Sequence, residues 1–421
     1  RQHPLSPNLC QRPWSSLFPS LFRLRRPSPP QLLHPNPLRF PLPLRNRPPL
    51  RTILGPNRRQ RLSLLPNRLL PNRLPLPNRL PLPLRLRNRP PRPLRAIPGI
   101  SRIISLYFVT GATGFIGSAL VRALTARGDS VRALCRTVPQ LPSGAVGISG
   151  DLLDAQSVRD AMAGCSHVFH MAAHARAGGP AETYENINVV GTQNVIDAAR
   201  HHRCERAVFT STSATLGPSD GGVHDETNTK DGPWFTAYEA TKRAAERLAL
   251  GSGLDAVLVH PCRVYGPGPL TQSNSVTKLI DLYQRGLFRF SLGDGRSVGN
   301  YVFVDDVVDG HLAAMASGRS GERYLLGGEN ASLGQLLDKI GEVSGHRRTV
   351  LGIPSGIVRR LAAVEEWRAK LIGGSPMISA DHVDRFQANY AFTTAKAQSE
   401  LGYSPRMLAE GIADTLEWLD E

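Results

Sequence analysis

From about residue 103 onward, short continuous apolar runs alternate with longer segments whose apolar residues recur at helical spacing. Residues 103–110 form an apolar run that ends at glycines, which is typical of a strand buried on both faces. Residues 115–127 have apolar side chains three or four positions apart and stop at Gly128, as a helix does. The same alternation predicts strands at 130–135, 145–149, 167–172, 207–212 and 255–260, and helices at 155–163, 188–201 and 237–250.

Strands that alternate with helices of this length predict an α/β fold with a parallel, doubly wound sheet. After about Pro267 the rhythm breaks into shorter pieces interrupted by glycine. We therefore expect residues 101–266 to form the sheet domain and residues 267–421 to form mainly a smaller C-terminal α+β lobe.

The first hundred residues have a different composition from the rest of the chain. They hold twenty arginines, no lysine, aspartate or glutamate, and 24 of the 35 prolines, whereas the remaining residues carry 31 basic and 34 acidic side chains. Frequent proline removes amide donors and disfavours helix at the preceding residue. We therefore predict a disordered, low-complexity tail over residues 1–100. Its charge of +20 and the −3 of the remainder make up the formal net charge of +17.

Three interpretations of the tail compete. It is an arginine-rich targeting segment, an arm that binds nucleic acid or membrane, or read-through of repetitive upstream sequence that is not part of the working protein. We favour the third, because the chain opens with Arg1 and its first methionine is Met162. The near-neutral remainder gives no reason to expect nucleic-acid binding there.

The folded part has no sign of a membrane span or of an oxidising compartment. No run approaches eighteen apolar residues. The five cysteines are scattered, without a Cys-x-x-Cys pair, so neither a disulfide framework nor a zinc site is indicated. We expect a cytoplasmic protein.

Glycines at positions 111, 114 and 117 lie where the first strand ends and the first helix begins. Gly111 permits a tight turn, Gly114 lets backbone approach phosphates, and Gly117 allows close packing of helix on strand. The helix N-terminus then presents free amides and its positive dipole end to a pyrophosphate. This context predicts a dinucleotide site.

The end of the second strand usually decides between NAD and NADP. An acidic residue there binds the ribose 2′-hydroxyl, but this chain has Arg136 and no carboxylate. Arg136 suits a 2′-phosphate, so we favour NADP over NAD; the alternative is that Arg136 is a solvated cation and both cofactors bind. Asp151 follows a strand and is placed either to contact the adenine or to cap the next helix.

Tyr238 and Lys242 stand four residues apart on a predicted helix and so share one face. A nearby ammonium lowers the pKa of a phenol, which makes tyrosine a proton carrier nearer neutral pH. Lysine can also bond the nicotinamide ribose. The pair follows a cluster of hydroxyl residues at 210–213 by one strand–helix step. We predict hydride transfer between a nicotinamide and a substrate, with Tyr238 moving the proton.

The sequence from about residue 103 to residue 421 resembles the extended short-chain dehydrogenase/reductases, the family of NAD-dependent epimerases and dehydratases. The resemblance implies a Rossmann-type nucleotide domain and a C-terminal substrate lobe. The matching stretches are Val109–Gly117, Gly150–Leu152, Val168–Ala173, Asn188–Thr192, Ser211–Thr215, Tyr238 with Lys242, Pro261–Gly266 and Tyr301–Val307.

The resemblance also implies individual roles. The catalytic residues would be Ser213, whose hydroxyl bonds the substrate oxygen, Tyr238 and Lys242, although Ser211 or Thr212 could instead be strand-end capping hydroxyls. We regard His170 and His174 as core and loop residues rather than metal ligands, and we assign no metal. The cofactor residues would be Gly111, Thr113, Gly114, Phe115, Ile116, Gly117, Arg136, Asp151, Leu152, Ala172, Ala173, Lys242, Pro261 and Arg263.

The substrate is less constrained than the chemistry. Nucleotide-sugar epimerases of the family often carry Arg-Asp before Tyr-Val, where this chain has Gly299 and Asn300, with Arg296 as the nearest cation along the chain. The usual Val-Tyr-Gly after the serine segment is replaced by residues 216–218. The stretches 212–217 and 321–330 resemble dihydroflavonol-reductase-like and hopanoid-associated relatives. We expect a carbonyl/alcohol oxidoreductase, with a nucleotide-sugar epimerase or dehydratase as the alternative.

A dinucleotide-sensing regulator without chemistry is a further alternative, which the presence of both Tyr238 and Lys242 disfavours. Relatives commonly pair through the helices predicted at 188–201 and 237–250. A homodimer is therefore a possible assembly, although both helices also suit ordinary packing against the sheet.

Overall fold

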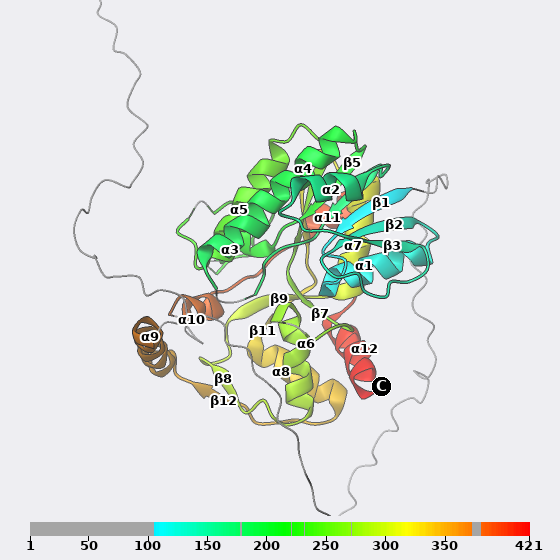
Figure 1. Ribbon diagram of the computed structural model, residues 1–421. Helices are drawn as coiled ribbons and strands as arrows, with labels where there is room; N and C mark the ends of the chain where they lie inside the picture. The colour runs from blue at the N-terminus through cyan, green and yellow to red at the C-terminus, as the bar shows by residue number, and fades with distance from the viewer. Residues whose placement is uncertain (1–104, 177–178, 220, 231, 271, 373–379) are drawn as a thin grey trace, which may run out of the picture. The chain divides into compact units, whose positions relative to one another are not determined.

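The computed structural model describes residues 105–421 except 177–178, 220, 231, 271 and 373–379. Within them, seven parallel strands form the main sheet in the order β10-β6-β5-β4-β1-β2-β3. Figure 1 labels β1, β2 and β3 side by side in this sheet. The strands are β1 (Leu106–Thr110), β2 (Ser130–Cys135), β3 (Ala145–Ser149), β4 (His167–His170), β5 (Arg206–Thr210), β6 (Ala256–Pro261) and β10 (Arg323–Leu326). This confirms the predicted doubly wound, Rossmann-type sheet. The predicted disorder of residues 1–100 lies outside the described residues.

Two hydrophobic cores cover the two faces of the main sheet. Successive residues of a strand point to opposite faces, so Val109 joins the core under one set of helices and its neighbour Phe108 joins the other. The first core packs against α1 (Phe115–Ala126) and α7 (Val304–Ser317), and the second against α2 (Ala155–Met162), α4 (Gly191–His201) and α5 (Ala237–Leu250). The central strands are largely apolar because both of their faces are buried.

Most element boundaries agree with the sequence, and one helix departs from it. The helix predicted at 188–201 begins earlier, as α3 (Ala181–Glu185), a π-helical turn (Asn186–Val190) and then α4. Asn188 within that turn is fully buried and bonds to backbone of the loop after β4. π-turns often occur at functional positions.

The C-terminal lobe contains two small sheets. The first has the order β11-β9-β7, and the second pairs β12 with β8. Their strands are β7 (Arg263–Tyr265), β8 (Phe290–Leu292), β9 (Val298–Phe303), β11 (Glu329–Ser332) and β12 (Leu351–Ile353). The helices of this part are α6 (Ser275–Gln284), α8 (Leu333–Ser344), α9 (Ser355–Ile372), α10 (Ala380–Gln387) and α12 (Leu408–Asp420).

The division into sheet domain and lobe is interleaved along the chain. After the first lobe segments, α7 returns to pack on α1, and β10 adds the edge strand beside β6. Residues 395–401 (α11) then pack on α7 and β10. A single boundary at residue 266 therefore does not separate the sheet domain from the lobe, because β10 comes after that residue and is buried beside β6 in the main sheet. No helix among the described residues has the length and apolar character needed to cross a bilayer.

Candidate functional site

The turn between β1 and α1 is packed so closely that two of its positions accept only glycine. Gly111 has a φ of +73°, and a Cβ there would lie 2.7 Å from the backbone nitrogen of Ala172. A Cβ on Gly117 would lie 2.1 Å from the carbonyl oxygen of Gly111. These contacts agree with the tight turn and the close helix packing that the sequence predicted for the two glycines.

The N-terminus of α1 has the features of a phosphate site. Its N-cap is Gly114, which supplies no side-chain cap, and the first turn has no acidic residue. A Cβ on Gly114 would meet only the oxygen of Gly111, at 3.1 Å, and Thr113 and Gly114 are exposed. The first amides of Phe115, Ile116 and Gly117 have no partner within the helix. Open space before free amides and a positive helix dipole fits the pyrophosphate of a dinucleotide.

Two positions at the ends of β2 and β3 were expected to contact the rest of the nucleotide. Arg136 is exposed directly after β2. Asp151 is exposed after β3, and its Oδ1 accepts a 2.9 Å hydrogen bond from the Leu153 amide. The cap of α2 is Asp154, whose carboxylate accepts from the amides of residues 156 and 157. The capping alternative for Asp151 is therefore wrong.

A buried relay of hydroxyl and imidazole groups joins the ends of β1 and β4. The Thr110 hydroxyl lies 2.7 Å from His170 Nδ1, and His170 Nε2 lies 2.9 Å from the hydroxyl of Thr192. Thr110 Oγ1 also accepts from the Ala172 amide at 3.2 Å. Burial and then the charge of Lys242 lower the pKa of His170 to about 3, so this imidazole is neutral. The relay holds the backbone of Ala172 against the glycine turn.

Helix α5 carries both candidate proton-transfer residues. Its N-cap is Thr236, which accepts a hydrogen bond from the Glu239 amide. Lys242 is buried, and its Nζ donates a 2.7 Å hydrogen bond to the carbonyl oxygen of Thr210 at the end of β5. Burial lowers the pKa of Lys242 to about 8, and Glu246 opposes that shift. The ammonium is therefore fixed at the carboxyl end of the sheet.

The electrostatics of Tyr238 differ from the expectation. Burial raises the pKa of its phenol, and the cation that opposes the shift is Arg385 of α10, together with a hydrogen bond from Thr212. Lys242 was expected to lower this pKa, but its ammonium is bonded to Thr210 instead. Arg385 also forms an ion pair of 2.9 Å with Glu239, beside Tyr238 on α5. It comes from a segment almost 150 residues downstream, and no sequence signal marked it.

The hydroxyl cluster after β5 separates into three environments. Ser211 donates to Glu246. Thr212 caps the short 3₁₀ helix Ser213–Leu216 and bonds the phenol of Tyr238. Ser213 is buried, and its hydroxyl bonds the thiol of Cys262. Ser211 therefore bonds a buried carboxylate, whereas Thr212 bonds the candidate proton carrier Tyr238 and Ser213 bonds a thiol.

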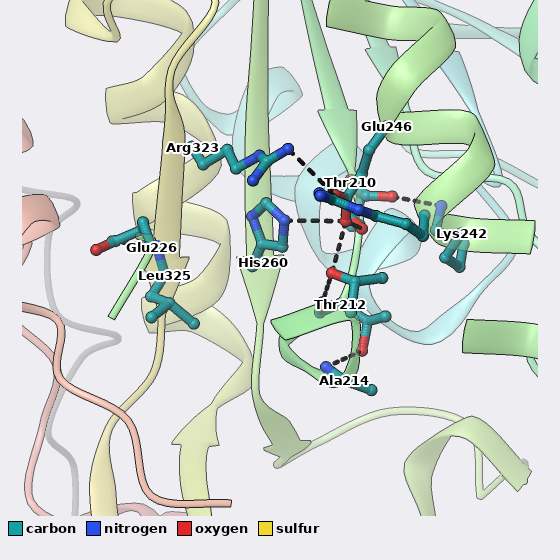
Figure 2. A network of polar contacts seen from close by, with 12 residues as sticks. Thr210, Thr212, Ala214, Glu226, Lys242, Glu246, His260, Arg323 and Leu325 are labelled. Atoms are coloured by element: carbon teal, nitrogen blue, oxygen red, sulfur yellow. Dashed lines mark hydrogen bonds and ion pairs between the residues drawn. The ribbon is translucent and has the colours of Figure 1, made fainter. Parts of the chain in front are cut away.

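A buried carboxylate beneath this cluster links four elements (Figure 2). Glu246 of α5 accepts hydrogen bonds from Ser211, from Thr215 Oγ1 at 2.6 Å and from His260 Nε2 of β6 at 3.0 Å. Its other oxygen accepts from Arg243 at 3.0 Å and lies 3.9 Å from Arg323 of β10. Burial alone would raise the pKa of this carboxyl, but His260 and the two hydroxyls hold it well below its usual range.

The sequence analysis did not predict two further residues that support the site. Glu246 stands four residues after Lys242, the spacing that Tyr238 and Lys242 also have. Asn188 accepts from the His174 amide at 2.7 Å and donates to Thr241 of α5 at 3.0 Å. Both tie α5 to neighbouring elements. The spacing of Glu246 was visible in the sequence, whereas nothing in the sequence pointed to the partners of Asn188.

The last two predicted cofactor residues lie between the sheet and the lobe. Pro261 is buried at the end of β6. Arg263 begins β7 and lies over the ring of Tyr301, with 5.7 Å from its Cζ to the ring centroid. The predicted residues thus gather at the carboxyl ends of β1 to β6.

Comparison with known proteins supports the same family. The pattern described as "NAD dependent epimerase/dehydratase family" matches residues 107–327. Sterol demethylase protein B of Methylococcus capsulatus is 33% identical over 74% of this chain and 98% of its own. The 2-alkyl-3-oxoalkanoate reductase of Stenotrophomonas maltophilia is 32% identical over 72% and 96%.

A solved structure agrees with these relatives. MoeE5 in complex with UDP-glucuronic acid and NAD is 29% identical, with a TM-score of 0.60 over 75% of this chain and 98% of that one. Relatives of this kind thus include both reductases and proteins that bind nucleotide sugars. The chain belongs to the NAD dependent epimerase/dehydratase family, the extended short-chain dehydrogenase/reductases.

Proposed function

We propose that the protein is an NAD(P)-dependent oxidoreductase that interconverts a carbonyl and an alcohol. The observation that carries the proposal is that the glycine turn, the Thr110–His170 hydrogen bond and Lys242 meet at one edge of the sheet. The glycine turn follows Thr110, Thr110 bonds His170, and the charge of Lys242 acts on His170. Nucleotide binding and proton transfer therefore share one region.

Different residues around the turn bind different parts of the nucleotide. Gly111, Thr113, Gly114 and the first amides of α1 hold the pyrophosphate, and Asp151 with Leu152 borders the adenine. Ala172, Ala173 and Pro261 border the nicotinamide, and Lys242 bonds its ribose. The nicotinamide supplies or accepts the hydride when it is bound.

Tyr238 is the proton carrier in this proposal. Its raised pKa keeps the phenol protonated at neutral pH, which suits a donor to the oxygen of a carbonyl under reduction. Ser213 holds the substrate oxygen, and Thr212, which touches the phenol, is the neighbouring hydroxyl. Arg385, which lowers the pKa of this phenol, supplies the positive charge that favours the phenolate formed when the proton leaves.

We propose NADP as the preferred cofactor, because Arg136 and no carboxylate follows β2. The family as a whole is described as NAD dependent, and MoeE5 was solved with NAD, so NAD is the alternative. For the substrate, the relatives named as reductases favour a carbonyl compound.

A nucleotide-sugar epimerase is the second candidate, and the bound sugar of MoeE5 favours it. The same residues would then oxidise and re-reduce one carbon with the cofactor retained. Two replacements disfavour it: Gly299 and Asn300 replace Arg-Asp, and residues 216–218 replace Val-Tyr-Gly, so that a tyrosine is missing. Substrate binding by the lobe and pairing of two copies through α4 and α5 stay predictions.

The test uses the full chain with NADPH or NADH and a panel of ketones, oxo acids and UDP-sugars. Net consumption of reduced cofactor supports the oxidoreductase, and isomerised UDP-sugar without net consumption supports the alternative. Tyr238→Phe should abolish turnover and leave nucleotide affinity nearly unchanged, because the ring stays and only the hydroxyl group is lost. A Tyr238→Phe protein with normal turnover contradicts the assigned proton transfer.

A further inference from the structure

The segment before Tyr301 offers no cation to a substrate. Asn300 is buried, its Nδ2 donates to Asn330 at 2.9 Å, and its Oδ1 accepts from the Gly328 amide at 2.8 Å. Arg296, the nearest cation along the chain, has a side chain that is 89% exposed and lies 3.6 Å from Asp294. Neither side chain is therefore available to an anionic group near Tyr238.

Arg263 occupies the space that Gly299 leaves open. β7 runs parallel to β9, and a Cβ built on Gly299 would lie 2.8 Å from both Cζ and Nη1 of Arg263. The guanidinium also lies over the ring of Tyr301, a contact that orients arginine. Gly299 and Tyr301 together fix where this cation stands.

The charge of Arg263 has no acidic partner in the part of the chain that the structure describes. The one hydrogen bond recorded there for its guanidinium is a 3.4 Å contact from Nη1 to the Tyr301 hydroxyl. The carboxylates nearby are engaged elsewhere: Glu226 accepts from the Leu325 amide at 2.7 Å, and Glu239 pairs with Arg385 at 2.9 Å. A guanidinium has five donors, so most of them are free for a ligand.

Arg263 lies on the same side of the site as the candidate catalytic groups. Arg263 and Arg385 both act on the phenol of Tyr390, and Arg385 forms an ion pair of 2.9 Å with Glu239 beside Tyr238. Tyr390 packs in one cluster with Leu216 of the 3₁₀ helix that begins at Ser213. A group bound by Arg263 would therefore face the region that contains Ser213 and Tyr238.

We propose that the side chain of Arg263 binds a carboxylate of the substrate, and that the substrate class is an oxo acid with its hydroxy counterpart. Arginine matches a carboxylate with two parallel hydrogen bonds. The inference rests on the proposed function, and it assigns this side chain to the substrate rather than the cofactor. In the reduction the carbonyl carbon gains a hydride from the reduced nicotinamide, the carbonyl oxygen gains the Tyr238 proton, and the carboxylate is unchanged.

The experiment compares a carboxylic acid with its ester in the full chain. Oxidation of 3-hydroxydecanoate and of its methyl ester is followed with NAD⁺ and NADP⁺, and binding of the acid to the protein with oxidised cofactor is measured by calorimetry. The variants are Arg263→Met, Arg263→Lys and Gly299→Ala, with Arg296→Met as the control. Circular dichroism and cofactor affinity check that each variant is folded.

We expect the wild type to prefer the acid and Arg263→Met to lower kcat/KM for the acid by about 10- to 100-fold, with the ester changed less than about threefold. Gly299→Ala should act in the same direction because its Cβ displaces the guanidinium, Arg263→Lys should lose less, and Arg296→Met should have no effect. Binding of the acid should weaken in parallel with kcat/KM.

Equal use of acid and ester by the wild type, or an equal loss for both in Arg263→Met, overturns the inference. So does conversion of UDP-glucose that depends on Arg263 without turnover of the acid, because the anion would then be a diphosphate. If ketones without a carboxyl group are reduced and the acids are not, the inference fails while the proposed oxidoreductase stands. If no substrate of either panel is converted, both fail.

Discussion

The two sides of the candidate site are built in different ways. The centre of the nucleotide side is one continuous stretch, the turn from β1 into α1, where Gly111 packs against the segment that follows β4. The proton-transfer side gathers Tyr238, Arg385, Glu246 and Arg263 from α5, α10 and β7. Short motifs specify the first side, whereas the second depends on the fold to bring distant segments together. Variants on one side should therefore leave the other side largely intact.

The largest effect is expected from Glu246, which supports only the proton-transfer side. Glu246→Ala leaves His260 and Arg243 without their carboxylate and should lower the free energy of unfolding by about 3–5 kcal/mol, measured by denaturant titration. Glu342→Ala is the matched control, because its exposed pair with Arg347 should contribute at most about 1 kcal/mol. Equal losses in both variants would contradict a supporting role for Glu246.

The same carboxylate gives a pH dependence with a defined sign. The pKa of Glu246 is depressed in the folded protein, so its stabilisation is complete above the unfolded value of 4.5 and is lost as the pH falls below it. The stability difference between wild type and Glu246→Gln should shrink accordingly in acid.

Glu246 also raises the pKa of Lys242, which is about 8. If the ammonium is needed, kcat/KM falls above pH 8, and in Glu246→Gln that fall should begin at lower pH.

What could be predicted from the sequence differs between the nucleotide side and the proton-transfer side in the same way. Periodicity predicted the strand at 130–135 and the helix at 237–250 because each is a local pattern that includes buried positions. The glycine turn was predicted for the same reason. Arg385 and the edge strand β10 were not, because their partners Glu239 and β6 lie about 146 and 65 residues away in sequence. An ion pair or a strand pairing between residues so far apart leaves no local spacing in the sequence from which it could be predicted.

A smaller effect, confined to the nucleotide side, is expected from Gly117→Ala. Alanine is the better helix former, but its Cβ would lie 2.1 Å from the oxygen of Gly111, so the turn must shift. We expect a loss of about 1–3 kcal/mol in stability and about tenfold weaker nucleotide binding. Gly222→Ala has open space around its Cβ and serves as the control. Unchanged nucleotide binding in Gly117→Ala would show that the turn does not hold the cofactor.

Arg385→Met tests the cation that the sequence did not reveal. Without this charge the pKa of the Tyr238 phenol should rise further, so alcohol oxidation at neutral pH should slow by about tenfold for each unit of pKa. Nucleotide affinity should stay within about twofold, since Arg385 lies on the other side of the site. Arg359→Met, which removes a surface ion pair between α9 and α10, is the control. A loss shared by both variants would indicate displaced α10 rather than altered electrostatics.

The smallest expected effect concerns the choice between NADP and NAD. Arg136 is exposed after β2, and an exposed arginine gains modest energy from a phosphate because water screens the charge. Arg136→Met should therefore raise KM for NADPH by about three- to tenfold and leave KM for NADH within about twofold; Arg289→Met, an exposed arginine of the lobe, should change neither. If NADPH and NADH respond alike, Arg136 is a solvated cation. The cofactor preference would then come from residues outside the β2 turn, and the nucleotide side would no longer be specified by local sequence alone.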